Sequence, residues 1–232
     1  MLNFAQIIAR EMFGKSEQNL QLELAGLVFP NPVGIPYLIH KRRFNWLHKA
    51  PNAGFFTLNP PQENVLAWIK GLTSEPESRI LAVNISSDII RTFSLVYDFA
   101  DFLIIDPDSD KGIDAADISD THSLLDELVS LRLCYEHYTP VFLRLSHGLS
   151  PEELENLLGT CQLNGLDGVV IPSLAMLGRV REITLGRVPI ICSVKTAEEG
   201  LEALREGAVL VELPSKKGLN TLLDSLENTS EI

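Results

Sequence analysis

Polar and charged side chains follow or interrupt several short apolar runs of this sequence, and their chemistry suits the binding of a small anionic molecule. The candidates are Lys41, Asn84, Asp106, Arg144, Ser173, Lys195, Ser215 and Lys216. Ammonium and guanidinium groups bind anions strongly, and nearby polar groups can orient them. Arg144 is the most informative, because it interrupts the apolar run at residues 140–145, where an unpaired charge would be costly. Solubilising loop charge is the alternative explanation for the lysines.

A run of aspartates from Asp106 to Asp117 approaches the spacing of a twelve-residue calcium loop. Its sixth position is Lys111 where a sharp turn needs glycine, and its last position is an aspartate where the loop needs glutamate. A solvated acidic loop is the simpler interpretation, and divalent-cation binding is kept as the alternative. The five histidines show no HExxH spacing, and the three cysteines show no CxxC spacing. The cysteines therefore indicate reduced thiols in a cytoplasmic protein.

The elements that must position these residues begin at residue 32, where short runs rich in Val, Ile, Leu and Phe alternate with segments of helical periodicity. The eight runs span residues 32–39, 54–59, 80–85, 101–106, 140–145, 168–173, 189–194 and 209–213. Most are continuously apolar, as expected for parallel strands covered on both faces. This α/β alternation predicts a (β/α)8 TIM barrel, in which functional residues gather at the carboxyl ends of the strands.

Local signals agree with the helices between these strands. Residues 150–153 and 196–199 have the spacing of capping boxes, and Gly165 and Gly207 stand where helices should end. Residues 1–20 lie outside the alternation and carry an apolar face. That face comprises Leu2, Phe4, Ile7, Ile8 and Met12. We expect an N-terminal helical extension that caps the bottom of the barrel, and a single barrel domain over residues 21–232.

Charge and hydropathy exclude several classes of partner. The chain of 232 residues has a net charge of −12, which opposes binding to nucleic acid. No apolar run reaches the roughly 20 residues that cross a bilayer, and the N-terminal residues do not have the pattern of a signal peptide. The short extension of an acidic protein also argues against membrane contact.

Several blocks of the sequence, in order, resemble the dihydroorotate dehydrogenases, a family of FMN-dependent barrel enzymes. The blocks are LAGLVFPNPVGIPYLIHK, RILAVNI, YDFADFLIIDPDS, PVFLRLSHGLSPEELENLLGTCQLNGLDGVVIPS and GRVPIICSVKTAEEGLEALREGAVLVEL. The resemblance extends from about Leu24 to Leu213. It implies oxidation of dihydroorotate to orotate with FMN as the hydride acceptor, a step of pyrimidine synthesis, and it suggests a homodimer.

The resemblance also implies roles for particular residues. Ser109 corresponds to the catalytic base of the family. Lys41, Asn84 and Ser173 correspond to substrate-binding positions. Asp106 and Arg144 stand at positions near the flavin, and Lys195, Ser215 and Lys216 could substitute a side-chain clamp for its phosphate.

The sequence departs from the family at two motifs. Residues 106–111 replace the family's Asn-x-Ser-Ser/Cys-Pro-Asn, and residues 192–195, Cys-Ser-Val-Lys, replace the Gly-Val-Gly-Gly that cradles the flavin phosphate. Side chains at the lost glycine positions would obstruct a close approach of phosphate to the backbone. The alternative hypothesis is therefore a pseudoenzyme, a non-catalytic barrel of the same family that binds a small anion or a protein partner.

Overall fold

A closed barrel of eight parallel strands forms the centre of the molecule, in the order β10-β3-β4-β5-β6-β7-β8-β9. The computed structural model describes residues 20–37, 50–72, 80–109 and 118–229. The barrel strands are β3 (Val33–Tyr37), β4 (Phe55–Leu58), β5 (Ile80–Ile85), β6 (Phe102–Ile105), β7 (Val141–Arg144), β8 (Gly168–Ile171), β9 (Ile190–Ser193) and β10 (Leu210–Glu212). All eight predicted strands, and with them the TIM barrel, are confirmed.

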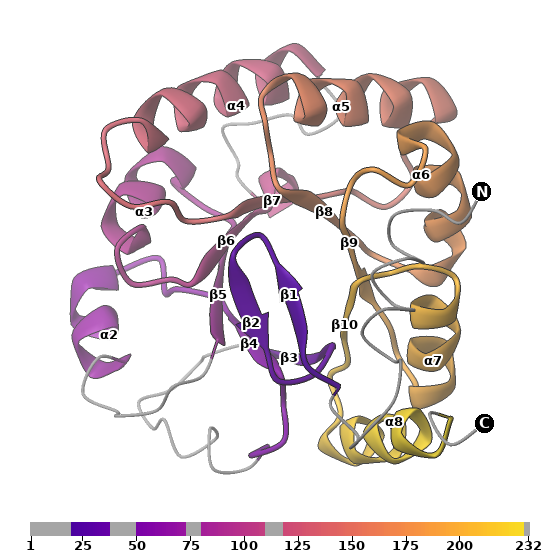
Figure 1. Cartoon of the computed structure of the whole chain (residues 1–232). Coiled ribbons are helices and arrows are strands. Elements are labelled where there is room, and N and C mark those ends of the chain that lie inside the picture. Colours follow the sequence, from indigo (N-terminus) through magenta and orange to yellow (C-terminus); the bar gives the residue numbers. More distant parts are fainter. Residues whose placement is uncertain (1–19, 38–49, 73–79, 110–117, 230–232) are drawn as a thin grey trace.

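Helices surround the ring of strands on its outer side (Figure 1). They are α2 (Val65–Leu72), α3 (Ile89–Val96), α4 (Ile118–Arg132), α5 (Pro151–Leu163), α6 (Leu177–Thr184), α7 (Ala197–Arg205) and α8 (Lys216–Thr229), with short 3-10 turns η2 (Pro107–Ser109) and η3 (Leu174–Met176). The capping box predicted at Ser150 is confirmed, since the side chains of Ser150 and Glu153 each accept the other's backbone N–H. Gly165 and Gly207 have positive φ angles of 63° and 103° and end α5 and α7, as predicted.

Two apolar clusters explain why the strands are apolar on both faces. The larger cluster lies between the strands and the helices, and a smaller one fills the barrel interior. Phe29, Phe55, Phe102 and Phe142 are the largest side chains of the inner cluster. Glycine makes room for them, since a Cβ on Gly34 would overlap the ring of Phe55 and one on Gly168 would overlap the ring of Phe142.

An antiparallel hairpin, β1 (Leu22–Leu24) and β2 (Leu27–Phe29), precedes the barrel and lies across the ring of strands in Figure 1. Its turn is Ala25-Gly26, with φ angles of 51° and 81°. Phe29 plugs the amino-terminal end of the barrel, and its ring centroid is 5.8 Å from that of Phe55. No strand was predicted before residue 32. Residues 1–19, expected to cap this end, lie outside the described residues.

Candidate functional site

The layer of side chains at the carboxyl ends of the strands is polar, in contrast to the phenylalanine-rich layers beneath it. A cavity of about 210 Å³ opens at this layer. Its lining residues are Pro36, Thr57, Asn59, Asn84, Arg144, Ser193 and Glu212. They come from or directly follow β3, β4, β5, β7, β9 and β10, so closure of the barrel is what brings them together.

Arg144 lies at the end of β7 and is held from three sides. Its Nε donates to Asn84 Oδ1 at 3.0 Å, and Nη1 donates to Ser193 Oγ at 3.3 Å. Its Nη2 donates to Glu212 Oε2 at 3.1 Å, which forms an ion pair. The charge that the sequence left unpaired in an apolar strand is therefore neutralised by a carboxylate from β10.

Glu212 is 1% exposed, and its carboxylate is well satisfied. Besides Arg144, the hydroxyls of Thr57 and Ser193 donate to it, at 2.5 and 3.1 Å. Sequence reasoning missed this residue, although the signal was present. Glu212 interrupts the apolar run 209–213 just as Arg144 interrupts its own run, and two opposite charges inside buried strands of one barrel should be paired.

Asp106 follows β6 at the edge of the same network. Its Oδ2 is 3.8 Å from Arg144 Nε and accepts a long hydrogen bond of 3.4 Å from Asn84 Nδ2. Burial raises the pKa of Asp106 above its ordinary value, and the nearby positive charge of Arg144 only partly opposes that effect. Asp106 is thus a carboxyl group that retains a proton more readily than a solvated aspartate, and it lies beside Arg144 and Asn84 of the pocket without being one of the lining residues.

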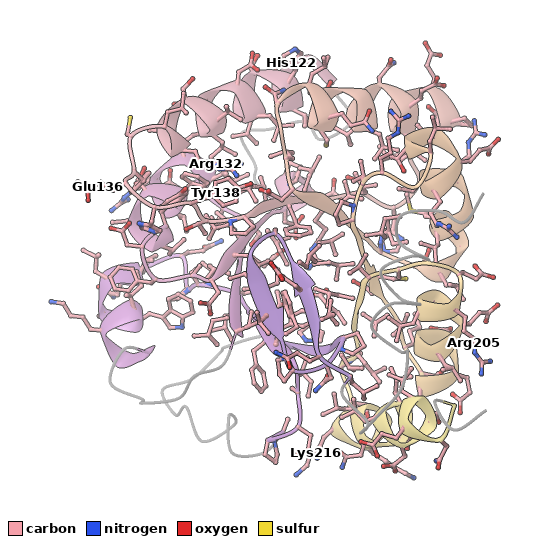
Figure 2. The ribbon with its side chains drawn as sticks, in the orientation of Figure 1. His122, Arg132, Glu136, Tyr138, Arg205 and Lys216 are labelled. Carbon is pink, nitrogen blue, oxygen red and sulfur yellow. The ribbon has the colours of Figure 1, made fainter. Side chains whose placement is uncertain are left out.

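The structure brings together three of the sequence-predicted site residues, Asn84, Asp106 and Arg144. The hydroxyl of Ser215 instead caps α8 by accepting the backbone N–H of Gly218 at 3.2 Å. Lys216 is exposed at the periphery of the molecule, at the start of α8 (Figure 2). Ser173 is half-buried and precedes η3, and its side chain makes no capping bond there. Lys41 and the side chain of Ser109 lie outside the described residues.

The α7 N-terminus, where the resemblance places a flavin phosphate, is occupied by the chain's own side chains. The Thr196 hydroxyl accepts the backbone N–H of Glu199 at 3.2 Å, as predicted for a helix cap. The Glu199 carboxylate, however, accepts the N–H of Lys195 at 2.8 Å, one residue before the expected partner. A negative charge therefore sits at the first turn, and the Lys195 side chain is exposed. These residues do not fit FMN in the way that the resemblance implies.

No cluster of three metal-binding side chains occurs among the residues that the structure describes. Most of the acidic run from Asp106 to Asp117 lies outside them, so the divalent-cation hypothesis remains a prediction. In the same part of the chain, no helix has both the length and the apolar character needed to cross a membrane.

The chain is thus a TIM barrel with a polar pocket at the carboxyl ends of its strands. No protein-family model and no curated protein sequence matches the chain. Solved structures do. The DHODH of Eimeria tenella in complex with ferulenol has a TM-score of 0.72 and 15% identity, covering 97% of this chain and 88% of that one. The ligand-free type of DHODH from the same organism has a TM-score of 0.77 and 17% identity, covering 94% of this chain and 89% of that one. The chain therefore has a DHODH-like fold, which confirms the predicted resemblance.

Proposed function

We propose that this chain is a barrel with the dihydroorotate dehydrogenase fold that binds a small polar ligand and does not carry out the FMN-dependent oxidation of dihydroorotate. The observation that carries the proposal is the Arg144–Glu212 ion pair at the centre of the strand-end pocket. At the position of Arg144 the resemblance expects a lysine that contacts the flavin. Here the guanidinium is turned to a carboxylate of the barrel itself.

The phosphate side of the pocket supports the same proposal. A helix N-terminus attracts an anion through its unpaired N–H groups and its dipole. At α7, the Thr196 hydroxyl already accepts the N–H of Glu199, and the Glu199 carboxylate, which accepts the N–H of Lys195, would repel a phosphate. The oxidoreductase hypothesis would need another way to hold the flavin.

The dimensions and donors of the pocket favour a small ligand with an oxygen acceptor. Its volume of about 210 Å³ is below the ~300–1,000 Å³ of sites for drug-sized ligands. Arginine has five N–H donors, and the contacts of Arg144 use Nε, Nη2 and one hydrogen of Nη1. The second Nη1 hydrogen can serve a carboxylate or carbonyl oxygen. We place the protein in a reducing compartment such as the cytoplasm, since all three cysteines are free thiols.

A flavin titration of the purified chain tests the catalytic part of the proposal. We expect no flavin bands in the near-ultraviolet and blue as purified, and no saturable quenching of FMN fluorescence. The double variant Val194→Gly/Lys195→Gly, alone and with Arg144→Lys, asks whether flavin affinity can be restored. Stoichiometric FMN in the unmodified chain, bleached by dihydroorotate, would overturn the proposal.

A thermal-shift screen with small carboxylic acids and amides tests the ligand part. A ligand at 100 times its Kd stabilises the folded state by about 2.7 kcal/mol, which is readily measured. We expect the ligand-induced rise in unfolding temperature to vanish in Arg144→Met/Glu212→Leu, because this variant lacks both the guanidinium donor and its counter-charge. The rise should persist in Lys217→Met, a control at an exposed residue. An equal shift in both variants would place the binding elsewhere.

A further inference from the structure

Asn59 follows β4 and lines the strand-end pocket. Side chains alternate between the two faces of a strand, so residues two apart share a face. On β4, Phe55 belongs to the inner apolar cluster and Leu58 to the outer one, while Thr57 lines the pocket. Continuing this alternation by one step turns the side chain of Asn59 to the same side as that of Thr57, toward the pocket.

The Asn59 amide is free to bind a ligand. The other polar side chains that line the pocket are all joined by hydrogen bonds, namely those of Thr57, Asn84, Arg144, Ser193 and Glu212. Across the described ranges of the chain, the side chain of Asn59 forms no such bond. A primary amide has two N–H donors and a carbonyl acceptor, so Asn59 can donate to a ligand and accept from it at the same time.

The charges at the pocket are already balanced. Arg144 and Glu212 are the charged residues among the described ones that line it, and they pair at 3.1 Å. Asp106 lies beside them, with Oδ2 3.8 Å from Arg144 Nε. An anion would therefore enter next to one carboxylate and near a second, and a cation would enter against the guanidinium. An unpaired charge is costly to bury, so this arrangement favours an uncharged ligand.

We propose that the ligand of this pocket is a small uncharged carboxamide, in place of the anion that the sequence predicts. The inference rests on the proposed function, in which the pocket binds a small polar ligand. The ligand N–H donates to Asn59 Oδ1, and Asn59 Nδ2 donates to the ligand carbonyl. The second lone pair of that carbonyl accepts the remaining hydrogen of Arg144 Nη1. A carboxylate lacks the donor that this pairing needs, and an amidinium lacks the acceptor.

Three planar molecules of one shape and different charge test the inference. They are propionamide, which is neutral, propionate, which is an anion, and propionamidine, which is a cation at neutral pH. NMR titration of the intact chain with each compound gives its Kd. We expect propionamide to bind roughly tenfold more tightly than either ion, because each ion loses one hydrogen bond and adds an unbalanced charge.

Two substitutions should change the preferred charge in opposite directions. Asn59→Asp should make propionamidine the tightest ligand and weaken propionamide roughly tenfold, since a carboxylate accepts both amidinium N–H groups. Glu212→Gln should favour propionate, because Arg144 then lacks its closest counter-charge. Gln162→Glu adds the same charge as Asn59→Asp at an exposed residue of α5, and it should leave the order unchanged. Circular dichroism checks each fold, and Asn59→Asp decides alone if Glu212→Gln does not fold.

The outcomes separate this inference from the proposed function. Binding of propionate or propionamidine as tight as that of propionamide would overturn the inference and leave ligand binding at the pocket intact. An unchanged order in Asn59→Asp would also overturn it. Absence of binding by all three compounds would overturn it as well. The proposed function would then depend on the thermal-shift screen, where a compound whose effect is lost in Arg144→Met/Glu212→Leu still binds at this pocket.

Discussion

At the scale of single residues, the strand-end pocket is governed by the pairing of Arg144 with Glu212. A buried pair costs desolvation energy that its mutual attraction and hydrogen bonds must offset, and it is far more sensitive to the loss of one partner than of both. Thr57, Ser193 and Asn84 supply those hydrogen bonds. The network therefore fixes one arrangement of the pocket.

Replacing one member of the pair should be much worse than replacing both. Glu212→Leu removes the closest carboxylate partner of Arg144 and leaves only Asp106 at 3.8 Å, and we expect a loss of about 3–5 kcal/mol in the free energy of unfolding. Arg144→Met/Glu212→Leu should recover most of that loss or exceed the original stability by up to about 4 kcal/mol. Urea unfolding followed by circular dichroism measures both. Equal losses in the single and double variants would contradict this account of the pair.

Asp106 should make stability depend on pH in a defined direction. Because burial raises the pKa of Asp106 in the folded state, the folded protein binds more protons than the unfolded one. The contribution of Asp106 to the free energy of unfolding therefore falls as pH rises from 3.8 through the folded pKa. Asp106→Asn should therefore be at least as stable as the original chain at neutral pH, and its advantage should shrink on acidification. Unfolding in urea across that pH range measures the difference, with the exposed Asp224→Asn as control. An advantage that grows at low pH would refute the sign.

The pocket could be predicted from sequence in part. Asn84, Asp106 and Arg144 stand at the ends of recognisable strands, so the fold alone brings them together. Glu212 could have been found by asking which buried strand supplies a counter-charge. The side-chain contacts of Ser215 and Glu199 could not be deduced from spacing, because a residue at a helix start can serve either a ligand or its own backbone, and only the local geometry decides.

At the scale of elements, the barrel interior is packed by placing phenylalanine rings against glycines, which have no side chain to occupy the same space. Gly168 on β8 stands against the ring of Phe142 on β7, and Gly34 on β3 stands against that of Phe55 on β4. The strands could be predicted because their apolar runs are continuous. The β1–β2 hairpin was missed because its strands are only three residues each, and because its turn, Ala25-Gly26, has alanine where such two-residue turns prefer asparagine, aspartate or glycine.

Glycine substitutions should separate this packing role from helix propensity. Gly168→Ala places a Cβ against the Phe142 ring and the Pro189 carbonyl, and we expect a loss of about 1–3 kcal/mol from overpacking. Gly159→Ala, inside α5 with open space around its Cα, should instead stabilise the protein by roughly 0.5–1 kcal/mol. Thermal unfolding of the two variants is the measurement. Similar effects of the two substitutions would show that ring packing does not constrain β8.

At the scale of the whole molecule, the barrel has a polar opening at one end and an aromatic plug at the other. The plug is Phe29, which is 1% exposed and stacks edge-on against Phe55 and Phe102. The hairpin that carries it is thus part of the barrel core. It ties the start of the described chain to strands from the middle of the sequence.

Removing the plug should destabilise the entire barrel. We expect Phe29→Ala to lower the free energy of unfolding by about 3–5 kcal/mol, because the surrounding rings cannot fill the space left. Leu66→Ala, at a side chain that is 55% exposed on α2, is the control and should change stability by less than about 0.5 kcal/mol. Chemical unfolding monitored by tryptophan fluorescence gives both values. A small loss for Phe29→Ala would mean that the hairpin is peripheral.

Closure of the barrel must wait for the end of synthesis, because β10, the last strand of the chain, pairs with β3, the first strand of the barrel. These strands share the register pairs Val211↔Val33 and Glu212↔Gly34, so the ring closes only with the last strand of the chain. A ribosome delivers Arg144 68 residues before its counter-charge. Until then the nascent sheet has two unpaired edges, and Arg144 lacks its closest carboxylate partner, since Asp106 lies farther away at 3.8 Å. When β10 is synthesised, it completes the ring of strands by pairing with β3, and its Glu212 forms the ion pair with Arg144. Closure of the barrel and pairing of this buried charge therefore depend on the same strand.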